Sequence, residues 1–266
     1  MNLTAKNILR KAGLQPLKRF GQNFLTDKKA IDRMVEAGQI SPSDIILEVG
    51  PGTGILTVEL AKRAGRVIAV EKDKRMCGIL EKTLQGFDNV AIVNEDIRKT
   101  PEIRQRKYKV MANLPFYLSA PLIRKFLESR NRPEQMILIV QKEVAQRISS
   151  KVPDMNLLAV SVQFYATPKI ISSIPKKSFW PQPEVDAAII KITPKKILPD
   201  ISPEKFFSVV KAGFSQPRKQ LLNNLSRKLG RKKEKVKAWL EKNGIQPKQR
   251  AETLAVEDWV SLAKTL

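Results

Sequence analysis

Histidine is absent from this chain of 266 residues, and cysteine occurs once, as Cys77. Without histidine there can be no Ser–His or Cys–His nucleophile pair, and Cys and His cannot supply a metal site between them, so we expect no metal. A single cysteine cannot form a disulfide within the chain, which is typical of a reducing compartment. Any chemistry must therefore depend on carboxylates, amides, backbone groups or a cofactor that carries its own reactivity.

Long apolar runs are missing as well. No stretch approaches the length of a membrane span, and the first residues lack the layout of a secretion signal. These absences predict a cytoplasmic protein with no membrane partner.

Acidic residues are scarce relative to basic ones. The 26 Asp and Glu against 49 Lys and Arg leave a net charge of +23, with a sequence pI near 10.2. A surplus of this size attracts polyanions through counterion release, so it favours a nucleic-acid partner, with ribosomal RNA as one candidate. The alternative is a basic surface that serves solubility alone.

From residue 45 onward, short apolar runs alternate with helical patterns. Runs without in/out alternation, each followed by a helix, indicate a parallel sheet covered on both faces, so we predict a doubly wound α/β fold of the Rossmann-like type. The predicted strands cover 45–49, 66–71, 90–95, 108–112 and 135–140, and helices cover about 54–64, 74–84 and 119–130 between them. Helices at about 4–12, 27–37 and 155–166 and candidate edge strands at 169–174 and 186–192 complete this part.

A proline-rich stretch at 193–206 marks the expected boundary between two domains. Beyond it the pattern is helical, at about 203–213, 217–229, 231–243 and 255–265, and residues 195–266 hold 17 Lys or Arg against 7 Asp or Glu. We therefore predict an α/β domain over residues 1–194 and a small, basic, all-helical domain over residues 195–266.

Three glycines, Gly50, Gly52 and Gly54, follow the first predicted strand in the segment ILEVGPGTGIL (46–56). Glycine lets the backbone turn tightly and lets a ligand approach it closely. The spacing is G-x-G-x-G, which differs from the G-x-G-x-x-G of dinucleotide binders and argues against a nicotinamide-dependent oxidoreductase. S-adenosylmethionine has no phosphate to place on a helix amino terminus, and it suits this turn, although a turn without any ligand is the simpler alternative.

Carboxylates follow at the ends of the next two predicted strands. Glu71 comes 21 residues after Gly50, where it can accept both hydroxyls of a ribose, and Asp96 is placed to meet the amino group of an adenine. Singly, each could be a solvated strand end or a helix cap. Because open α/β sheets bind ligands at the carboxyl ends of their strands, together they predict the S-adenosylmethionine site of a class I methyltransferase sheet.

The fourth predicted strand ends in Asn113-Leu114-Pro115-Phe116, at the same edge of the sheet. The exocyclic nitrogen of adenine is a poor nucleophile because its lone pair is delocalised into the ring. The side-chain oxygen of Asn113 and the carbonyl of Leu114 would accept its N–H bonds, while Pro115 fixes the turn and Phe116 offers a stacking face. No histidine is needed, since a sulfonium leaving group is already activated.

Eight segments taken together carry a resemblance to a known family. They are FGQNFLTD (20–27), EVGPGTGILT (48–57), VEKD (70–73), EDI (95–97), NLPFYLSAPLI (113–123), FWPQPEVDAAII (179–190), FSQPRKQLLNNL (214–225) and RAETLAVEDW (250–259). In these segments the chain resembles the small-subunit ribosomal RNA adenine dimethyltransferases of the KsgA type. The resemblance implies S-adenosylmethionine contacts at Asn23, Leu25, Gly50, Glu71, Asp96 and Asn113, a target adenine held by Asn113 through Phe116, and Phe179 packed on the base from the other side.

The implied activity is transfer of two methyl groups to each of two adjacent adenosines near the 3′ end of the small-subunit (16S) RNA, presented on an immature 30S subunit during ribosome biogenesis. The basic carboxyl-terminal domain would help to dock the RNA, and nothing demands more than a monomer. The RNA-binding candidates there are Arg218, Lys219, Arg227, Lys228, Arg231 and Lys232. Three positions depart from the family pattern: Phe116 stands for a usual tyrosine, Ala188 for a usual serine, and Pro217 for a common basic residue.

Two other functions stay open. A large-subunit methyltransferase of the antibiotic-resistance type would keep the chemistry and change the target, but NLPF at 113–116 and the segment FWPQPEVDAA favour the small-subunit group. A non-catalytic RNA-binding assembly or transcription factor would keep only the fold, and the intact Glu71, Asp96 and Asn113 argue against it.

Overall fold

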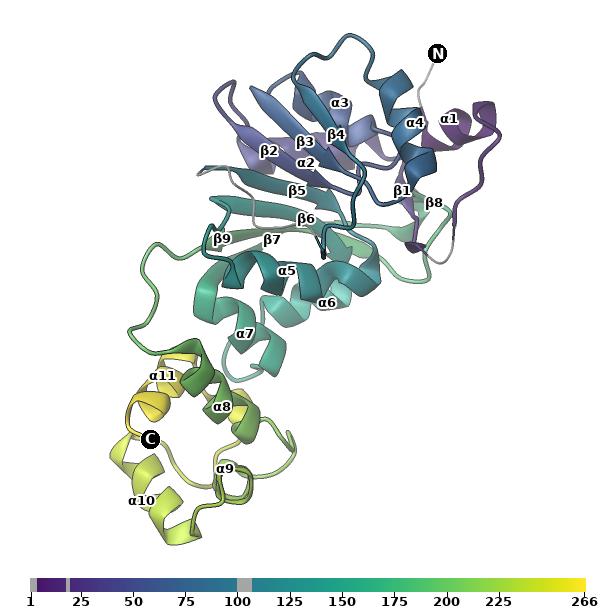
Figure 1. Cartoon of the computed structure of the whole chain (residues 1–266). Coiled ribbons are helices and arrows are strands. Elements are labelled where there is room, and N and C mark those ends of the chain that lie inside the picture. The colour runs from purple at the N-terminus through teal and green to yellow at the C-terminus, as the bar shows by residue number, and fades with distance from the viewer. Residues whose placement is uncertain (1–3, 18–19, 100–106) are drawn as a thin grey trace. The chain divides into compact units, whose positions relative to one another are not determined.

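The computed structural model describes residues 4–17, 20–99 and 107–266, and its largest element is a seven-stranded sheet (Figure 1). The strand order is β4-β3-β2-β5-β6-β9-β7, in which β4, β3, β2, β5 and β6 are parallel neighbours and β9 runs antiparallel to β6. Their bounds are β2 (Ile45–Val49), β3 (Arg66–Val70), β4 (Val90–Val93), β5 (Lys109–Asn113), β6 (Gln135–Gln141), β7 (Ala166–Ile174) and β9 (Ala187–Pro194). The predicted doubly wound, mostly parallel fold is confirmed.

Both faces of this sheet are covered by other parts of the chain. Val110, Met111 and Ala112 are consecutive in β5 and all fully buried, although neighbouring side chains in a strand point to opposite faces. Such two-sided burial explains why the central strands read as unbroken apolar runs. The helices that belong to this region are α1 (Ala5–Lys11), α2 (Lys28–Gly38), α3 (Ile55–Ala61), α4 (Lys74–Thr83) and α5 (Ser119–Glu128), with a 3₁₀ turn η2 (Phe116–Leu118).

The strand registers place several chain segments at one edge of the sheet. Val49 at the end of β2 is level with Val70 in β3, and Val70 is level with Val93 in β4. The order of the strands reverses beside β2, whose neighbours are β3 and β5. A reversal of this kind opens a crevice outside the carboxyl ends of the strands, which is where open α/β sheets bind ligands.

A second, two-stranded sheet ties the amino-terminal segment to the loop before β9. In it β1 (Phe24–Leu25) runs antiparallel to β8 (Phe179–Trp180), so that Phe24 pairs with Trp180 and Leu25 with Phe179. A 3₁₀ turn, η3 (Lys176–Ser178), comes directly before β8. The two later strands predicted as edge strands both join the large sheet, but β9 lies between β6 and β7, and β7 is the outer one.

The chain forms two compact units, one of residues 1–145 with 168–194 and one of residues 146–167 with 195–266. The structure thus differs from the expected division at residues 146–167, which were expected in the α/β domain. The reason lies in α7 (Leu157–Tyr165), where the ring of Phe164 stacks on that of Phe206 with centroids 4.1 Å apart. Aromatic pairs of this kind contribute strongly to a core, so α7 packs with the carboxyl-terminal helices.

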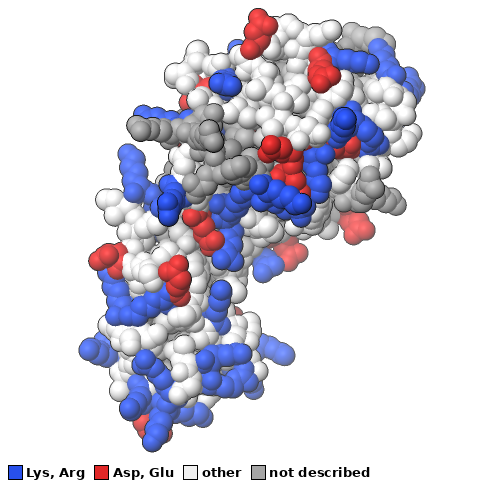
Figure 2. Space-filling model, in the orientation of Figure 1, with Lys and Arg blue, Asp and Glu red and all other residues white. Residues whose placement is uncertain are grey.

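Helices make up the rest of the second unit: α8 (Pro203–Gly213), α9 (Leu221–Leu229), α10 (Lys233–Lys242) and α11 (Val256–Lys264), with a 3₁₀ turn η4 (Ala251–Thr253). Another helix, α6 (Lys142–Ile148), follows β6 directly and was not predicted. α9 begins at Leu221, four residues later than the predicted start. Lys and Arg side chains cover much of the face of the second unit that Figure 2 shows, with few acidic ones between them.

Within the described ranges, no helix is long and apolar enough to cross a membrane. The same residues contain no cluster of three His, Cys, Asp or Glu side chains that could hold a metal ion.

Candidate active site

An open pocket of about 820 Å³, counted with its solvent-filled mouth, lies at the carboxyl ends of β2 to β5. Residues 20–24, 70–72, 95–98 and 113–118 line it, together with Val49, Gly50 and Gly52. Four strand ends and the segment before β1 therefore converge on one space.

Most of the residues singled out in the sequence line this pocket: Asn23, Gly50, Gly52, Glu71, Asp96, Asn113, Leu114, Pro115 and Phe116. Three others do not. Gly54 caps α3, while Leu25 and Phe179 are paired across β1 and β8 and are only 8% and 4% exposed in the core. Phe116 packs against the core cluster that contains Phe179, so the two rings belong to one apolar region although only Phe116 reaches the pocket.

The turn after β2 needs glycine for two separate reasons. Gly50 and Gly52 have φ angles of +67° and +58°, a region that side chains rarely adopt. A Cβ atom on Gly52 would also lie 2.8 Å from the Phe24 ring, which is too close for real contact. The bare backbone therefore forms the floor of the pocket, and it is fixed by the Gly50 N–H, which donates to the Val70 carbonyl at 2.9 Å.

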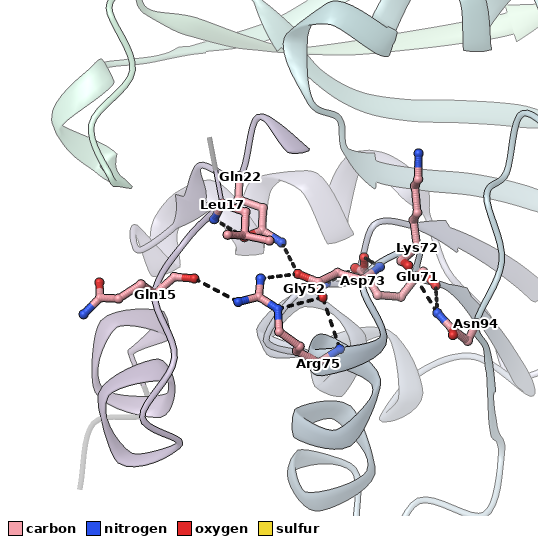
Figure 3. Close-up of polar contacts among 9 residues, drawn as sticks. All are labelled: Gln15, Leu17, Gln22, Gly52, Glu71, Lys72, Asp73, Arg75 and Asn94. Atoms are coloured by element: carbon pink, nitrogen blue, oxygen red, sulfur yellow. Dashed lines mark hydrogen bonds and ion pairs between the residues drawn. The ribbon is translucent and has the colours of Figure 1, made fainter. Parts of the chain in front are cut away.

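Glu71 presents a buried carboxylate that the backbone holds in place (Figure 3). It is 8% exposed and accepts hydrogen bonds from the Gly52 N–H to Oε2 at 3.2 Å and from the Asp73 N–H to Oε1 at 2.8 Å. Burial raises the pKa of Glu71 above its usual range, and these backbone hydrogen bonds oppose the rise. Each oxygen has a second lone pair, so the carboxylate can still accept two hydroxyl donors.

A polar network links this carboxylate region to the segment before β1, and the sequence alone did not reveal it (Figure 3). Gln22 donates from Nε2 to Asp73 Oδ2 at 3.0 Å and accepts the Leu17 N–H at 2.8 Å. Arg75 donates from Nη2 to the same Asp73 oxygen at 2.5 Å. Burial would raise the pKa of Asp73, but the bonds from Arg75 and Gln22 outweigh it and hold the pKa below its usual range. The available signal was the position of Asp73, two residues after Glu71 and directly before the predicted helix 74–84.

Asp96 forms ion pairs at the wall of the pocket. Arg98 donates to it from Nε at 3.0 Å and from Nη2 at 2.6 Å, and the Lys72 ammonium lies 3.1 Å from Oδ2. The hydrogen bonds from Arg98 are the main reason that the pKa of Asp96 is held far below its usual range. The carboxylate is therefore ionised, so both of its oxygens are acceptors for an amino group.

The orientation of Asn113 follows from one contact. Its Nδ2 atom donates to the Asn23 carbonyl at 2.9 Å, which directs Oδ1 away from that carbonyl. The chain then turns at Pro115, whose φ is −53°, and the Leu118 N–H donates to the Pro115 carbonyl at 2.8 Å to close η2. An amide oxygen, a constrained turn and an aromatic ring thus follow one another along the pocket wall.

The six RNA-binding candidates all lie on the surface of the second unit. Arg218 and Lys219 are exposed before α9, Arg227 and Lys228 in its last turn, and Arg231 and Lys232 between α9 and α10. Arg231 also donates to the Leu266 carbonyl at 3.3 Å. All six cations are exposed and lie around the two ends of one short helix.

The family model described as "Ribosomal RNA adenine dimethylase" matches residues 14–266. The chain belongs to this family. Ribosomal RNA small subunit methyltransferase A of Dehalococcoides mccartyi (strain BAV1) is 42% identical over 264 residues, which cover 97% of this chain and 91% of that protein. The protein of the same name from Moorella thermoacetica is 40% identical, with coverage of 97% and 95%.

Two solved structures are similar in fold over most of the chain. A dimethyladenosine transferase from Plasmodium falciparum has a TM-score of 0.78 and 28% identity, covering 90% of this chain and 95% of that one. The 23S rRNA methyltransferase ErmE has a TM-score of 0.76 and 26% identity, covering 92% and 99%.

As a member of the ribosomal RNA adenine dimethylase family, the chain is a methyltransferase whose cofactor is S-adenosylmethionine. The pocket fits that molecule. Its floor is bare glycine backbone, it has ionised or buried carboxylates for hydroxyl and amino donors, and G-x-G-x-G spacing replaces the pyrophosphate-binding turn of dinucleotide enzymes.

Proposed function

We propose that the chain transfers methyl groups from S-adenosylmethionine to N6 of two adjacent adenosines near the 3′ end of small-subunit ribosomal RNA, giving N6,N6-dimethyladenosine. The observation that carries this proposal is that Glu71, Asp96 and the segment 113–116 line one pocket. The relatives that are 42% and 40% identical over nearly the whole chain are named for the small subunit, which supports that target. The 23S rRNA methyltransferase ErmE, at 26% identity, is the basis of the alternative target.

On the cofactor side, the residues of this chain bind and orient. Glu71 accepts the two ribose hydroxyls, and Asp96 accepts the adenine amino group, with Gly50 and Gly52 allowing close approach. Asn23 lines the pocket and its carbonyl holds Asn113 in place, while Leu25 in β1 and Gly54 at the start of α3 lie outside the lining of the pocket. When bound, S-adenosylmethionine supplies a methyl group on a positively charged sulfur, a leaving group that needs no acid.

On the substrate side, Asn113 and Leu114 act on the amino group of the target adenine. The Asn113 Oδ1 atom and the Leu114 carbonyl accept its two N–H bonds, which draws the nitrogen toward a tetrahedral geometry and makes its lone pair available for attack. Phe116 stacks on the base, and this contact is worth about 1–3 kcal/mol. Phe179 does not line the pocket; it lies in the core cluster against which Phe116 packs. After transfer, the nitrogen releases its extra proton to water.

The second unit serves as the RNA-docking part of this proposal. Its exposed cations, among them Arg227 and Lys228, would contact phosphates of the RNA, which fix position without reading sequence. We propose that a monomer acts in the cytoplasm, on RNA that is presented within an immature small subunit.

The proposal is tested by transfer of labelled methyl from S-adenosylmethionine to undermethylated small subunits and, in parallel, to large subunits, followed by nucleoside analysis. N6,N6-dimethyladenosine in small-subunit RNA alone is the expected result. Label in the large subunit alone would replace the proposed target with the one named for ErmE. No label in either, with cofactor still bound, would leave an RNA-binding assembly factor on this fold.

A further inference from the structure

The mouth of the pocket carries an aromatic ring that the proposed adenine clamp does not use. Tyr117 lines the pocket and is 53% exposed. Single exposed rings are common on protein surfaces and need no ligand to explain them. The surroundings of this ring therefore decide whether it has a role.

The position of Tyr117 in η2 separates it from the clamp. A 3₁₀ helix has three residues per turn, so neighbouring side chains point about 120° apart. Phe116 packs against the core, and Tyr117 points to the solvent at the mouth. The two side chains therefore leave the backbone in different directions, so a base held by Phe116 leaves Tyr117 available to another one.

The backbone of Gly21 supports the Tyr117 ring along one edge. A Cβ atom on Gly21 would lie 3.2 Å from Tyr117 Cε1 and 3.4 Å from Pro115 Cβ, so the ring edge lies directly against this backbone and a side chain here would push on it. Gly21 has a φ of +60°, which also favours glycine. The ring is thus held from below while about half of its surface stays open to solvent.

Two cations lie at the same mouth. Arg98 and Lys72 both line the pocket, and Lys72 Nζ is 5.6 Å from the centre of the Phe20 ring. Tyr117 lines the same pocket, and the pKa of Arg98 is raised mainly by its hydrogen bonds to Asp96. The pair with Asp96 uses Nε and Nη2 of Arg98, and the other edge of the guanidinium has further N–H donors.

Stacking rings beside cations are the usual means by which proteins hold single-stranded nucleic acid, because bases have flat faces and phosphates are negative. RNA is a polymer, so an adenosine in the pocket brings its neighbour to the mouth. We propose that this mouth is a second nucleotide subsite, in which Tyr117 stacks on the base next to the target adenosine and Arg98 and Lys72 contact the phosphate between the two. This inference rests on the proposed function.

The test begins by mapping the methylated adenosine that the parent enzyme produces in small-subunit RNA. Tyr117→Leu keeps an apolar side chain against Gly21 but has no ring, and Tyr117→Phe keeps the ring. We expect Tyr117→Leu to raise the KM for the small subunit by about 5- to 150-fold, the range that loss of one stacked base gives. Tyr117→Phe should stay close to the parent, and both variants should bind S-adenosylmethionine as the parent does.

A change in the RNA then separates stacking from other roles of the ring. Small subunits reconstituted with an abasic residue beside the target adenosine should abolish the difference between Tyr117→Leu and the parent. If Tyr117→Leu and the parent still differ in KM on the abasic substrate, or if they do not differ on the natural substrate, the subsite is refuted. The proposed function would then remain intact. A parent enzyme that does not methylate small-subunit RNA would overturn the proposed function itself, and the subsite with it.

Discussion

Asn113 is oriented by a single hydrogen bond, from its Nδ2 atom to the Asn23 carbonyl at 2.9 Å. That bond determines which side of the amide faces the pocket. In the sequence, Asn113 and Pro115 look like an ordinary turn after a strand. In the structure, Oδ1 of Asn113 is an acceptor with a defined orientation. Single residues of this kind determine what the site can do, and Asn113 allows a direct test.

Replacement of Asn113 by alanine should remove catalysis without removing RNA binding. The change deletes the acceptor for the amino group of the target adenine, and loss of one such group lowers kcat by about 10²–10³-fold. Asn113→Asp should also be impaired, because it places a carboxylate oxygen instead of a donor against the Asn23 carbonyl. Single-turnover methyl transfer and RNA binding are measured on both variants, and unchanged transfer by Asn113→Ala would refute the assigned role.

Glu48 is a second residue whose state can be measured, because it is 1% exposed in β2 and burial raises its pKa to about 8. In the unfolded chain the pKa of this group is the ordinary 4.5 of a glutamate. Between these two values the folded protein keeps a proton that the unfolded chain has released. The free energy of unfolding should therefore fall as the pH rises through this window, by about 1.4 kcal/mol per pH unit from this group.

Glu48→Gln cannot ionise, so its free energy of unfolding should exceed that of the parent by a margin that grows from pH 5 to pH 8 and is constant above. Chemical denaturation at several pH values measures this margin. Glu36→Gln makes the same charge change at an exposed position of α2 and is the control. A margin independent of pH would contradict the assignment of a protonated Glu48.

At the level of helices and strands, the sequence predicted those elements whose pattern is local. β2, β3, β5 and β6 were found within one or two residues because buried parallel strands are continuous apolar runs. β1 and β8 were not, because two residues carry no periodicity. The placement of α7 in the second unit depends on a ring contact with Phe206, which no local pattern contains.

In the candidate site, too, local patterns in the sequence predicted some residues, whereas contacts between distant residues were missed. The sequence predicted that Gly50, Glu71, Asp96 and Asn113 lie together because each ends or follows a predicted strand, and parallel strands end at one edge; all four line the pocket. The bond between Gln22 and Asp73 was missed because its partners are 51 positions apart in the chain. Contacts of this kind need the fold before they can be seen, and this one holds the segment 20–24 at the pocket.

Gln22→Ala should weaken cofactor binding without lowering the rate at saturating cofactor. The change removes the acceptor of the Leu17 N–H and the bond to Asp73, so the segment 20–24 is held less firmly. Loss of about 1–2 kcal/mol corresponds to a dissociation constant about 5- to 30-fold higher.

Titration calorimetry with S-adenosylmethionine measures the effect of Gln22→Ala. Gln15→Ala is the matched control, since Gln15 enters the network only through its carbonyl, which accepts from Arg75. Equal affinities in the two variants would show that the network does not position the pocket wall.

For the whole molecule, net charge is the property that can be counted directly from the sequence. The fold determines where on the surface the charged side chains lie. The net charge is +23, and residues 195–266 contribute 17 of the 49 Lys and Arg. Cations that meet phosphates release counterions, so each contact makes binding weaken more steeply as salt is added. The salt dependence of RNA binding therefore counts the cations that take part.

Arg227 and Lys228 allow this count to be made with a matched control. Both are exposed in the last turn of α9, whereas Lys62 and Arg63, directly after α3, already pair with Glu59 at 2.7 Å and 2.8 Å. Each double alanine variant removes one Lys and one Arg, so the loss of net charge is the same. We expect the slope of log affinity against log salt to become shallower by about 1.4–1.8 when Arg227 and Lys228 are replaced, because each phosphate contact contributes about 0.7–0.9.

The slope should stay at the parent value when Lys62 and Arg63 are replaced, because Glu59 already neutralises much of their charge. Equal slopes for the two double variants would show that the RNA responds to net charge alone. In that case the end of α9 would not be part of the docking surface. A shallower slope for the α9 variant alone would place phosphate at the carboxyl end of α9, where Arg231 and Lys232 follow after Leu229 and Gly230.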